Sequence, residues 1–463
     1  MFGRKGTIQP TLCAVTFSVR GLVTGVACGD LYLWNGRSVA KVVKAHNDAV
    51  TALHTAQDKL VSGSRDRTVK VWDENLTLVK AFDMTIACPG AMRASICSVC
   101  VDPGVTKIAV GTLGSEIYEL CYHSGSATLL NEGHCEHELW GLATHPNKPH
   151  IFATSGDDNT VRVWNTASRM IETRTNVDTM TRAIAWSPNG DLLAVGTGGV
   201  LAGESPEESD RPGGALIVIT ADNMEIVHEG RDSKECIQDV RFSPDGTCFA
   251  VASRDSNIYL YDVTNGFSLK GKCQKHSSFL THVDFSANSK WLQSTCGGFE
   301  LMYYDADTGS HNPTGGAELR DMDWSSWTLP FGWPVKGLWQ KGEDAEEARP
   351  DILAVDRDHD NSLLAVGDAA GRVRVFTYPC AAEGDVESVQ GRAHAANVTN
   401  VRFSSDSSHL ITVGGRDRVI CQWKVIQPPP VPEEEEVNLL LPPETDAKGG
   451  DEGDEGDEGE FKS

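Results

Sequence analysis

The 463-residue sequence contains no long apolar run. No stretch approaches the roughly 20 apolar residues that a membrane-spanning helix needs, and no basic region precedes a short apolar run as in a secretion signal. A GxSxG elbow, a GxxxxGK[ST] phosphate loop and an HExxH helix are also missing. These absences predict a soluble protein of the cytoplasm, without a membrane partner and without the commonest hydrolase, nucleotide or metalloprotease sites.

Basic residues are scarce relative to acidic ones. Lys and Arg number 41 against 65 Asp and Glu, which gives a net charge of -24. Counting charges places about -11 of this on the last 31 residues and about -13 on the rest. Because nucleic-acid binding needs a basic surface that displaces counterions from phosphates, we expect no nucleic-acid partner.

Cysteine is present, but not as a disulfide or metal framework. The 13 cysteines are an odd number, scattered through strand-like runs, which favours reduced and mostly buried thiols. Cys97 and Cys100 form a CxxC pair in a strand pattern, where residues three apart point to opposite faces. The run Gly133–His137 (GHCEH) has no second Cys or His pair at zinc-finger spacing. We therefore expect no metal, no cofactor and no small-molecule substrate.

What the chain does contain is a repeat. LVSGSRDRTVKVWD, ending at Asp73, recurs as FATSGDDNTVRVWN, ending at Asn165, and as LITVGGRDRVICQWKV, ending at Val425. With weaker copies such as CFAVASRDSNIYLYD, about nine units follow one another, most at the 40 to 50-residue spacing of propeller blades. Each reads as short strands joined by tight turns, and ring closure would cover the apolar faces of such sheets. The pattern predicts an all-β propeller.

The number of units exceeds one ring. Propellers usually hold four to eight blades, so seven units over residues 83–427 suffice for one, and two blades over residues 1–82 are left as the end of an incomplete first propeller. Residues 428–463 begin with prolines and continue as an acidic, Gly-rich segment that predicts a disordered tail. The tail has three interpretations: a solubilising end, an internal competitor for a basic surface, or a binder of a basic partner.

One interval departs from the repeat. Between Tyr304 and Phe376 the chain carries the Trp-rich stretch RDMDWSSWTLPFGWPVKGLW. It predicts an enlarged blade whose aromatic side chains pack against a neighbouring blade. The alternative is an exposed aromatic binding patch.

The repeat resembles the WD repeat. In WD repeats, four residues form a structural hydrogen-bonded network: a His before the blade, a Ser or Thr on its second strand, an Asp in the next turn and a Trp on the third strand. The unit that starts at His276 keeps Ser294 but has Gly298 in the turn and Tyr304 for Trp, so we expect an incomplete network there. In three units the resemblance implies a complete one: His46, Ser62, Asp66 and Trp72; His134, Thr154, Asp158 and Trp164; His394, Thr412, Asp417 and Trp423.

Several stretches resemble the echinoderm microtubule-associated protein-like (EMAP-like) family more closely than WD proteins in general. They include GHCEHELWGLATHPNKPHIFATSGDDNTVRVWN, the Trp-rich stretch and the closing HAANVTNVRFSSDSSHLITVGGRDRVICQWKV. The resemblance runs from about Gly21 to Val425 and is closest to that family's C-terminal half. The coiled coil, the hydrophobic EMAP-like motif and the N-terminal propeller of typical members have no counterpart before these repeats, which weakens the implied microtubule role.

The resemblance implies a non-enzymatic scaffold of the microtubule cytoskeleton. Its partners would be tubulin, microtubules or microtubule-associated proteins, with a cilium as one setting. The alternative is a WD-repeat adaptor in another complex, without direct tubulin binding, because fold alone does not choose between partners. Catalysis is not expected, since His, Ser or Thr, and Asp recur at the same place in many units, whereas a nucleophile and its base are needed once.

Arginines in the turns after the second strands are the candidate partner-binding residues. If the ring closes, these turns share one face and form a basic rim on an acidic body. The rim would receive acidic partner segments, such as tubulin tails, or each Arg would simply pair with an acidic neighbour on its own blade. The residues are Arg65, Arg67, Arg254, Arg416 and Arg418.

Overall fold

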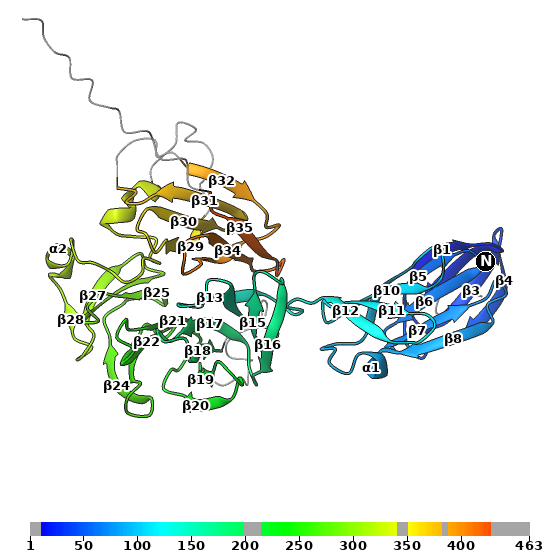
Figure 1. Ribbon diagram of the computed structural model, residues 1–463, viewed down its shortest axis with the longest axis horizontal. Helices are drawn as coiled ribbons and strands as arrows, with labels where there is room; N and C mark the ends of the chain where they lie inside the picture. Colours follow the sequence, from blue (N-terminus) through cyan, green and yellow to red (C-terminus); the bar gives the residue numbers. More distant parts are fainter. Residues whose placement is uncertain (1–10, 199–213, 340–350, 382–387, 427–463) are drawn as a thin grey trace, which may run out of the picture. The chain divides into compact units, whose positions relative to one another are not determined.

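The computed structural model describes residues 11–198, 214–339, 351–381 and 388–426 (Figure 1). In these residues short antiparallel strands form eight four-stranded sheets and one three-stranded sheet. In each of these sheets the strands follow one another in chain order from one edge to the other, as in propeller blades. The predicted all-β propeller class is confirmed, while the number of blades in a ring stays a prediction. The predicted tail, residues 428–463, lies outside the described residues.

Three sheets make up the first part of the described chain, and we name each sheet by its strands. Their strands are β1 (Leu12–Ser18), β2 (Gly21–Val26), β3 (Asp30–Asn35), β4 (Ser38–Lys44), β5 (Val50–Ala56), β6 (Lys59–Ser64), β7 (Thr68–Trp72), β8 (Leu78–Asp83), β9 (Ile96–Val101), β10 (Lys107–Thr112), β11 (Ile117–Cys121) and β12 (Ala127–Asn131).

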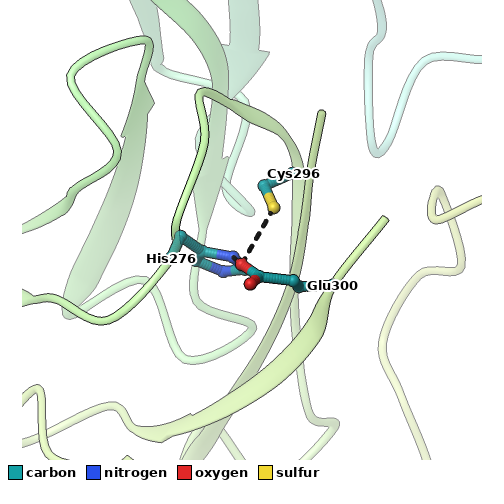
Figure 2. A group of neighbouring side chains, drawn as sticks. All are labelled: His276, Cys296 and Glu300. Atoms are coloured by element: carbon teal, nitrogen blue, oxygen red, sulfur yellow. Dashed lines mark hydrogen bonds and ion pairs between the residues drawn. The ribbon is translucent and has the colours of Figure 1, made fainter. Parts of the chain in front are cut away.

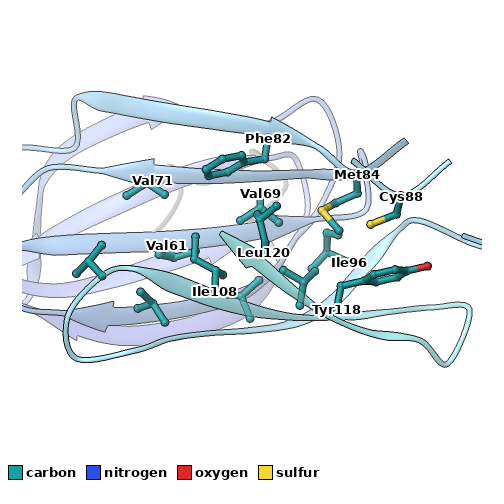
Figure 3. Close-up of a cluster of buried hydrophobic side chains, with 14 residues drawn as sticks. Val61, Val69, Val71, Phe82, Met84, Cys88, Ile96, Ile108, Tyr118 and Leu120 are labelled. Carbon is teal, nitrogen blue, oxygen red and sulfur yellow. The ribbon is translucent and has the colours of Figure 1, made fainter. Parts of the chain in front are cut away.

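The second and third of these sheets share a core. Figure 3 shows Val61 and Val69 of sheet β5–β8 in one buried cluster with Ile96, Ile108 and Leu120 of sheet β9–β12. The structure therefore packs the third sheet on the second. The predicted division of the chain at residue 83 stays a prediction.

Six further sheets follow, the last of them with three strands. Their strands are β13 (Leu139–Thr144), β14 (Ile151–Gly156), β15 (Thr160–Asn165), β16 (Met170–Asn176), β17 (Thr181–Trp186), β18 (Leu192–Thr197), β19 (Leu216–Thr220), β20 (Ile226–Gly230), β21 (Ile237–Phe242), β22 (Cys248–Ser253), β23 (Ile258–Asp262), β24 (Ser268–Cys273), β25 (Leu280–Phe285), β26 (Trp291–Cys296), β27 (Leu301–Asp305), β28 (His311–Asn312), β29 (Ile352–Arg357), β30 (Leu363–Asp368), β31 (Arg372–Thr377), β32 (Ser388–Arg392), β33 (Val398–Phe403), β34 (His409–Gly414) and β35 (Ile420–Lys424).

The first strand of each of these six sheets lies on the inside of a ring, and the last sheet contacts the first (Figure 1). Hydrogen bonds at this closure join residues about 260 to 280 positions apart in the sequence. Thr399 Oγ1 donates to the carbonyl of Leu139 at 2.6 Å, and Thr144 Oγ1 donates to that of Phe403 at 2.8 Å. The amide of Leu139 donates to the carbonyl of Gly415 at 3.0 Å. Residues 139–425 thus form a closed unit.

Tight turns connect the strands as their residues predict. In Ser243-Pro244-Asp245-Gly246, between β21 and β22, the amide of Gly246 donates to the carbonyl of Ser243 at 2.9 Å. Gly246 has a φ of 72°, a value that glycine adopts without a steric penalty. The Ser243 hydroxyl also accepts the amide of Cys248 at 3.0 Å, which ties the turn to the next strand.

The Trp-rich stretch fills the space between the β25–β28 and β29–β32 sheets. Trp324 and Trp327 are 4% and 3% exposed and pack in one cluster with Val355 and Leu364. The amide of Ser325 donates to the carbonyl of Phe285 at 3.0 Å, which fixes the stretch to the end of β25. These two indoles match the prediction that the stretch packs against a neighbouring sheet.

Helical structure is minor among the described residues. It consists of α1 (Met84–Ala87), α2 (Gly315–Glu318) and the 3-10 segment η1 (Trp333–Trp339). None of these is long or apolar enough to pass through a bilayer. The 13 thiols are all free, and six are buried, three are half-buried and four are exposed, so the prediction of mostly buried thiols was too general.

Glycines on the second strands allow neighbouring sheets to approach. Gly63 in β6 and Gly367 in β30 hold the same position in their sheets, and each faces the first strand of the next sheet. A Cβ on Gly367 would lie 2.6 Å from Val398 Cγ1. Because buried cores are close-packed, such a contact requires the sheets to move apart.

We predict that Gly367→Ala lowers the free energy of unfolding by about 1 to 3 kcal/mol, the usual effect of extra volume in a packed core. Urea denaturation followed by tryptophan fluorescence measures this change. Gly316→Ala is the matched control, because a Cβ there meets only Tyr303 Cε2, at 3.9 Å. Equal midpoints for the two variants would contradict the packing argument.

Candidate functional site

The segment before the first strand and the turn between the second and third strands lie at the same end of each sheet, because consecutive strands are antiparallel. We call this end the loop face. It carries the predicted His and Asp residues and the predicted arginines. Its geometry decides which of these side chains are free to meet a partner.

His46 is the centre of a hydrogen-bonded chain in sheet β5–β8. Its Nε2 lies 2.7 Å from Ser62 Oγ, and its Nδ1 lies 3.1 Å from Asp66 Oδ2. Trp72 Nε1 donates to Ser62 Oγ at 2.8 Å. If Nδ1 is protonated and donates to Asp66, Nε2 accepts a hydrogen bond from the Ser62 hydroxyl. Each side-chain polar group of this network then has a partner. The structure thus brings these four residues together.

Burial controls the charge of His46. It lowers the pKa of His46 to about 4, although the carboxylate of Asp66 favours the charged form. The pKa of Asp66 lies below its ordinary value, because hydrogen bonds from Thr68 and from the Asn47 amide outweigh the effect of burial. Near neutral pH the pair therefore consists of a neutral imidazole and a carboxylate, which suits a structural role.

The same arrangement recurs in two sheets of the closed unit. Nε2 of His134 lies 2.8 Å from Thr154 Oγ1, and Trp164 Nε1 donates to that hydroxyl at 2.7 Å. His134 Nδ1 lies 2.9 Å from Asp158 Oδ1. Arg162 also donates to Asp158, at 3.1 Å, and its side chain is 1% exposed. The metal-like run at residues 133–137 thus has its first His engaged in the sheet.

In the last sheet the network is looser. Thr412 Oγ1 lies 2.8 Å from His394 Nε2 and accepts Trp423 Nε1 at 3.0 Å. The distance from His394 Nδ1 to Asp417 Oδ2 is 3.5 Å, longer than in the other two networks. Asp417 accepts the amide of Ala395 at 2.7 Å, as Asp66 accepts that of Asn47.

The unit that starts at His276 has a carboxylate that sequence reasoning missed. His276 Nε2 lies 2.8 Å from Ser294 Oγ, and its Nδ1 lies 3.5 Å from Glu300 Oε2 (Figure 2). Glu300 stands two residues after Gly298, at the place that Thr68 holds in the β5–β8 sheet. The network is incomplete as expected: the hydroxyl of Tyr304 lies against Met302 Sδ and makes no indole-type bond to Ser294, and His276 Nδ1 makes no hydrogen bond.

Glu300 is held as a carboxylate. The amide of Ser277 donates to its Oε2 at 2.9 Å, as the amide of Asn47 does to Asp66. Hydrogen bonds from the amide and hydroxyl of Ser277 and from the Cys296 thiol lower the pKa of Glu300 to about 2. The Asp side chain of the turn is thus replaced by the longer Glu300 side chain, which extends from the residue just before β27.

His276, Cys296 and Glu300 place one ligand atom each within 4.8 Å of one another. Nitrogen, sulfur and oxygen are ligands that zinc accepts. Here, however, Cys296 Sγ donates to Glu300 at 3.2 Å, and burial raises the pKa of the thiol, which opposes the thiolate that a metal needs. We interpret the group as a variant of the structural network.

The predicted arginines are exposed or half-buried, and those with described contacts lean toward the following sheet. Arg416 Nε donates to Glu138 at 3.1 Å with a side chain that is 74% exposed. The guanidinium of Arg254 stacks on Phe279, 4.8 Å from its ring centre. Arg418 reaches the carbonyl of His137 at 3.5 Å. Arg65 and Arg67 are exposed in the β6–β7 turn of the first part. Pairing on the same blade is not what the described contacts show.

Exposed aromatic side chains lie beside Arg254. Phe279 and Phe299 are 39% and 75% exposed. Phe331 meets Phe299 edge to face at 5.8 Å and stacks on Trp339 at 5.1 Å, and Trp339 is 44% exposed. The Trp-rich stretch thus has a buried half and an exposed half. We call these four residues the aromatic patch.

Comparison with known families agrees with this architecture. A family profile described as the second beta-propeller of echinoderm microtubule-associated protein matches residues 139–425, the span of the closed unit. A second profile, the G-beta repeat of the WD domain, matches residues 37–73.

Relatives share about a third of the residues. Echinoderm microtubule-associated protein-like 2 of Rattus norvegicus is 34% identical over 433 residues, which cover 92% of this chain and 62% of the relative. Echinoderm microtubule-associated protein-like 4 of Mus musculus is 31% identical over 454 residues, which cover 94% of this chain and 43% of the relative. Echinoderm microtubule-associated protein-like 1 of Mus musculus is 33% identical over a stretch that covers 92% of this chain and 50% of the relative. The chain spans about half the length of these relatives.

We predict that stability falls as the pH drops from 6.5 to 4. Above pH 6.5 His46 is neutral in both the folded and unfolded states, but below it only the unfolded chain binds the proton. The shift to about 4 corresponds to a loss of about 3 kcal/mol at the acid limit, at 1.36 kcal/mol per pKa unit.

Denaturant unfolding at several pH values, compared between the natural protein and His46→Gln, measures this contribution. The variant should be less stable at pH 7 and lose less stability on acidification. His123→Gln, at an exposed position, is the control and should follow the natural protein. Parallel curves for His46→Gln and the natural protein would rule out the predicted role of His46.

Proposed function

Because the chain belongs to the family of the echinoderm microtubule-associated protein second beta-propeller, we propose that it is a microtubule-associated WD-repeat scaffold of the cytoskeleton. Its relatives carry microtubule association in their names. It acts by binding tubulin, microtubules or their associated proteins through the loop face, without catalysis. We place it in the cytoplasm, on the cytoskeleton, including that of cilia.

The observation that supports a partner-binding loop face is the exposed arginine beside exposed aromatic rings. Arg254 stacks on Phe279, and a stacked guanidinium keeps its edge free to donate hydrogen bonds. Arg416 holds only one exposed ion pair, with Glu138. Exposed pairs of this kind contribute about 0 to 1 kcal/mol, so a partner carboxylate can replace Glu138 at little cost.

Acidic protein segments suit this surface. Arginine binds carboxylates with two parallel hydrogen bonds, and the surrounding acidic body disfavours acidic partners elsewhere. The aromatic patch adds apolar surface area, and large aromatic side chains are among the residues that contribute most to binding at protein interfaces. We propose that the acidic tails of tubulin dock on Arg254 and the aromatic patch. Arg416 and Arg418 form a second contact, and Arg65 and Arg67 form a third in the first part.

We predict that Arg254→Glu combined with Arg416→Glu weakens co-sedimentation with microtubules at least about tenfold, since each change replaces an attraction by a repulsion. The loss should shrink at high salt, where exposed charges are screened. Arg65→Glu, made separately, tests the first part. Circular dichroism checks that the variants remain folded.

Arg169→Glu is the matched control, because this exposed arginine lies in the β15–β16 turn at the opposite end of its sheet. Its binding should equal that of the natural protein. Unchanged binding of the double variant would exclude the arginine surface. A natural protein that does not sediment with microtubules at all would instead favour the alternative, an adaptor in another complex.

The aromatic patch generates a separate prediction. Phe299→Ser removes the most exposed ring of the patch, and we expect about a three- to tenfold loss of microtubule affinity with little change in stability. Val389→Ser, at a residue that is 77% exposed on the outer strand β32, is the control. An affinity loss that is equal in the two variants would show a nonspecific apolar effect.

A further inference from the structure

A cavity of about 450 Å³ lies at the end of the closed unit opposite the loop face. The C-terminal ends of all six first strands meet here. Figure 1 shows five of these strands, labelled β13, β17, β21, β25 and β29, around the middle of the ring. Its wall includes one residue from the end of each strand or just after it: Thr144, Trp186, Phe242, Ala287, Arg357 and Phe403.

The next-to-last residues of the six first strands form one layer at this cavity, and all of them except Asp284 line it. Around the ring the layer consists of Ala143, Ala185, Arg241, Asp284, Asp356 and Arg402. The two carboxylates are neighbours on one side, and the two arginines flank them. The two alanines occupy the remaining side, between Arg402 and Arg241, where short side chains leave space. Both alanines and both arginines line the cavity.

The two guanidinium groups have buried N–H groups without partners. Arg402 is 8% exposed, and its Nε has no hydrogen bond. Nε and Nη2 of Arg241 are likewise buried and unpaired. Arg357, also in the wall, has an unpaired Nε. Among the described residues of this wall, every buried side-chain atom without a partner is a nitrogen of an arginine.

The nearby carboxylates do not satisfy these donors, because backbone amides hold them. Asp356 accepts the amide of Phe403 at 2.7 Å and lies 3.9 Å from Arg402 Nη1. Asp284 accepts the amide of Thr328 at 2.7 Å and lies 3.9 Å from Arg241 Nε. These separations permit attraction between the charges but exceed hydrogen-bond length.

Both arginines remain charged near neutral pH. Burial and the neighbouring Arg241 lower the pKa of Arg402 only to about 10. Burial acts against the charge of Arg241 too, but Asp239, Asp284 and Asp356 outweigh it and raise its pKa. An unpaired buried donor costs about 1 to 3 kcal/mol, and more if it is charged, so the layer favours an acceptor in the space beside the alanines.

We propose that this cavity binds a small oxyanion, the phosphate or carboxylate group of a solute molecule, between Arg241 and Arg402. A carboxylate is planar and a phosphate is tetrahedral, and each presents two oxygen atoms that a guanidinium group binds through paired N–H donors. The volume lies within the range of small-ligand pockets, so the anion can be part of a small organic molecule. The site is independent of partner binding on the loop face.

Titration calorimetry of the whole chain tests the proposal, with inorganic phosphate and citrate as separate probes at constant ionic strength and with chloride as the reference. We expect saturable binding of one probe molecule per chain, and the tighter probe shows whether phosphate or carboxylate is preferred. Arg402→Met and Arg241→Met should each weaken binding at least about tenfold, the usual effect of removing a charged hydrogen-bond donor.

Arg231→Met is the matched control, because this exposed arginine pairs with Glu229 outside the cavity, and its binding should not change. If the cavity variants fail to fold, Ala143→Val keeps every charge and adds volume beside the guanidinium groups, and it should also abolish binding. Absence of saturable binding of either probe to the natural protein would overturn the proposal and indicate that water alone pairs with these donors. Binding that survives both Arg402→Met and Ala143→Val would place the anion elsewhere and overturn it as well.

Discussion

The packing of one sheet against the next is the interaction on which the whole structure depends. An isolated four-stranded sheet exposes two apolar faces, and burying them contributes roughly 25 cal/mol per Å² of apolar surface. Val398 and Val401 of one first strand lie against Gly367 of the preceding sheet, and Ile96 lies against Gly63 in the same way. Removing any one sheet would expose the faces of both neighbours.

Ring closure completes this burial in residues 139–425. The hydrogen bonds of Thr399 and Leu139 across the closure are of ordinary strength, about 1 kcal/mol each. Their importance lies in their position, because they join the first sheet of the closed unit to its last. Much of the stability thus comes from the packing of the sheets, and the exposed side chains of the turns can carry other chemistry.

Much of this was predictable from local patterns. The His, Ser or Thr, Asp and Trp of three units recur at fixed spacing, and the structure brings each set together because all four lie in one sheet. Glu300 escaped the pattern, because the carboxylate comes from a residue two positions later than usual. Matching residue types by position misses a substitution in which the function of one side chain passes to another.

Sequence reasoning could not divide the Trp-rich stretch into its buried and exposed halves. Trp327 and Trp339 belong to the same pattern of aromatic residues, yet one packs against the next sheet and the other stacks on Phe331 at the surface. Burial here depends on sheet β29–β32, whose residues follow the stretch in the chain. Composition identified the segment but not its contacts.

The layer that contains Arg241 and Arg402 was harder still to predict from the sequence, because it depends on the register of six strands between residues 139 and 403. Within its own strand, Arg402 is an ordinary polar residue next to Phe403, and only the closed ring places it in one layer with Arg241. The same register places two alanines between them, so the charge and the space arise together. The ring therefore has two chemically different ends: exposed arginines and aromatic rings at the loop face, and buried arginines around a cavity at the other end.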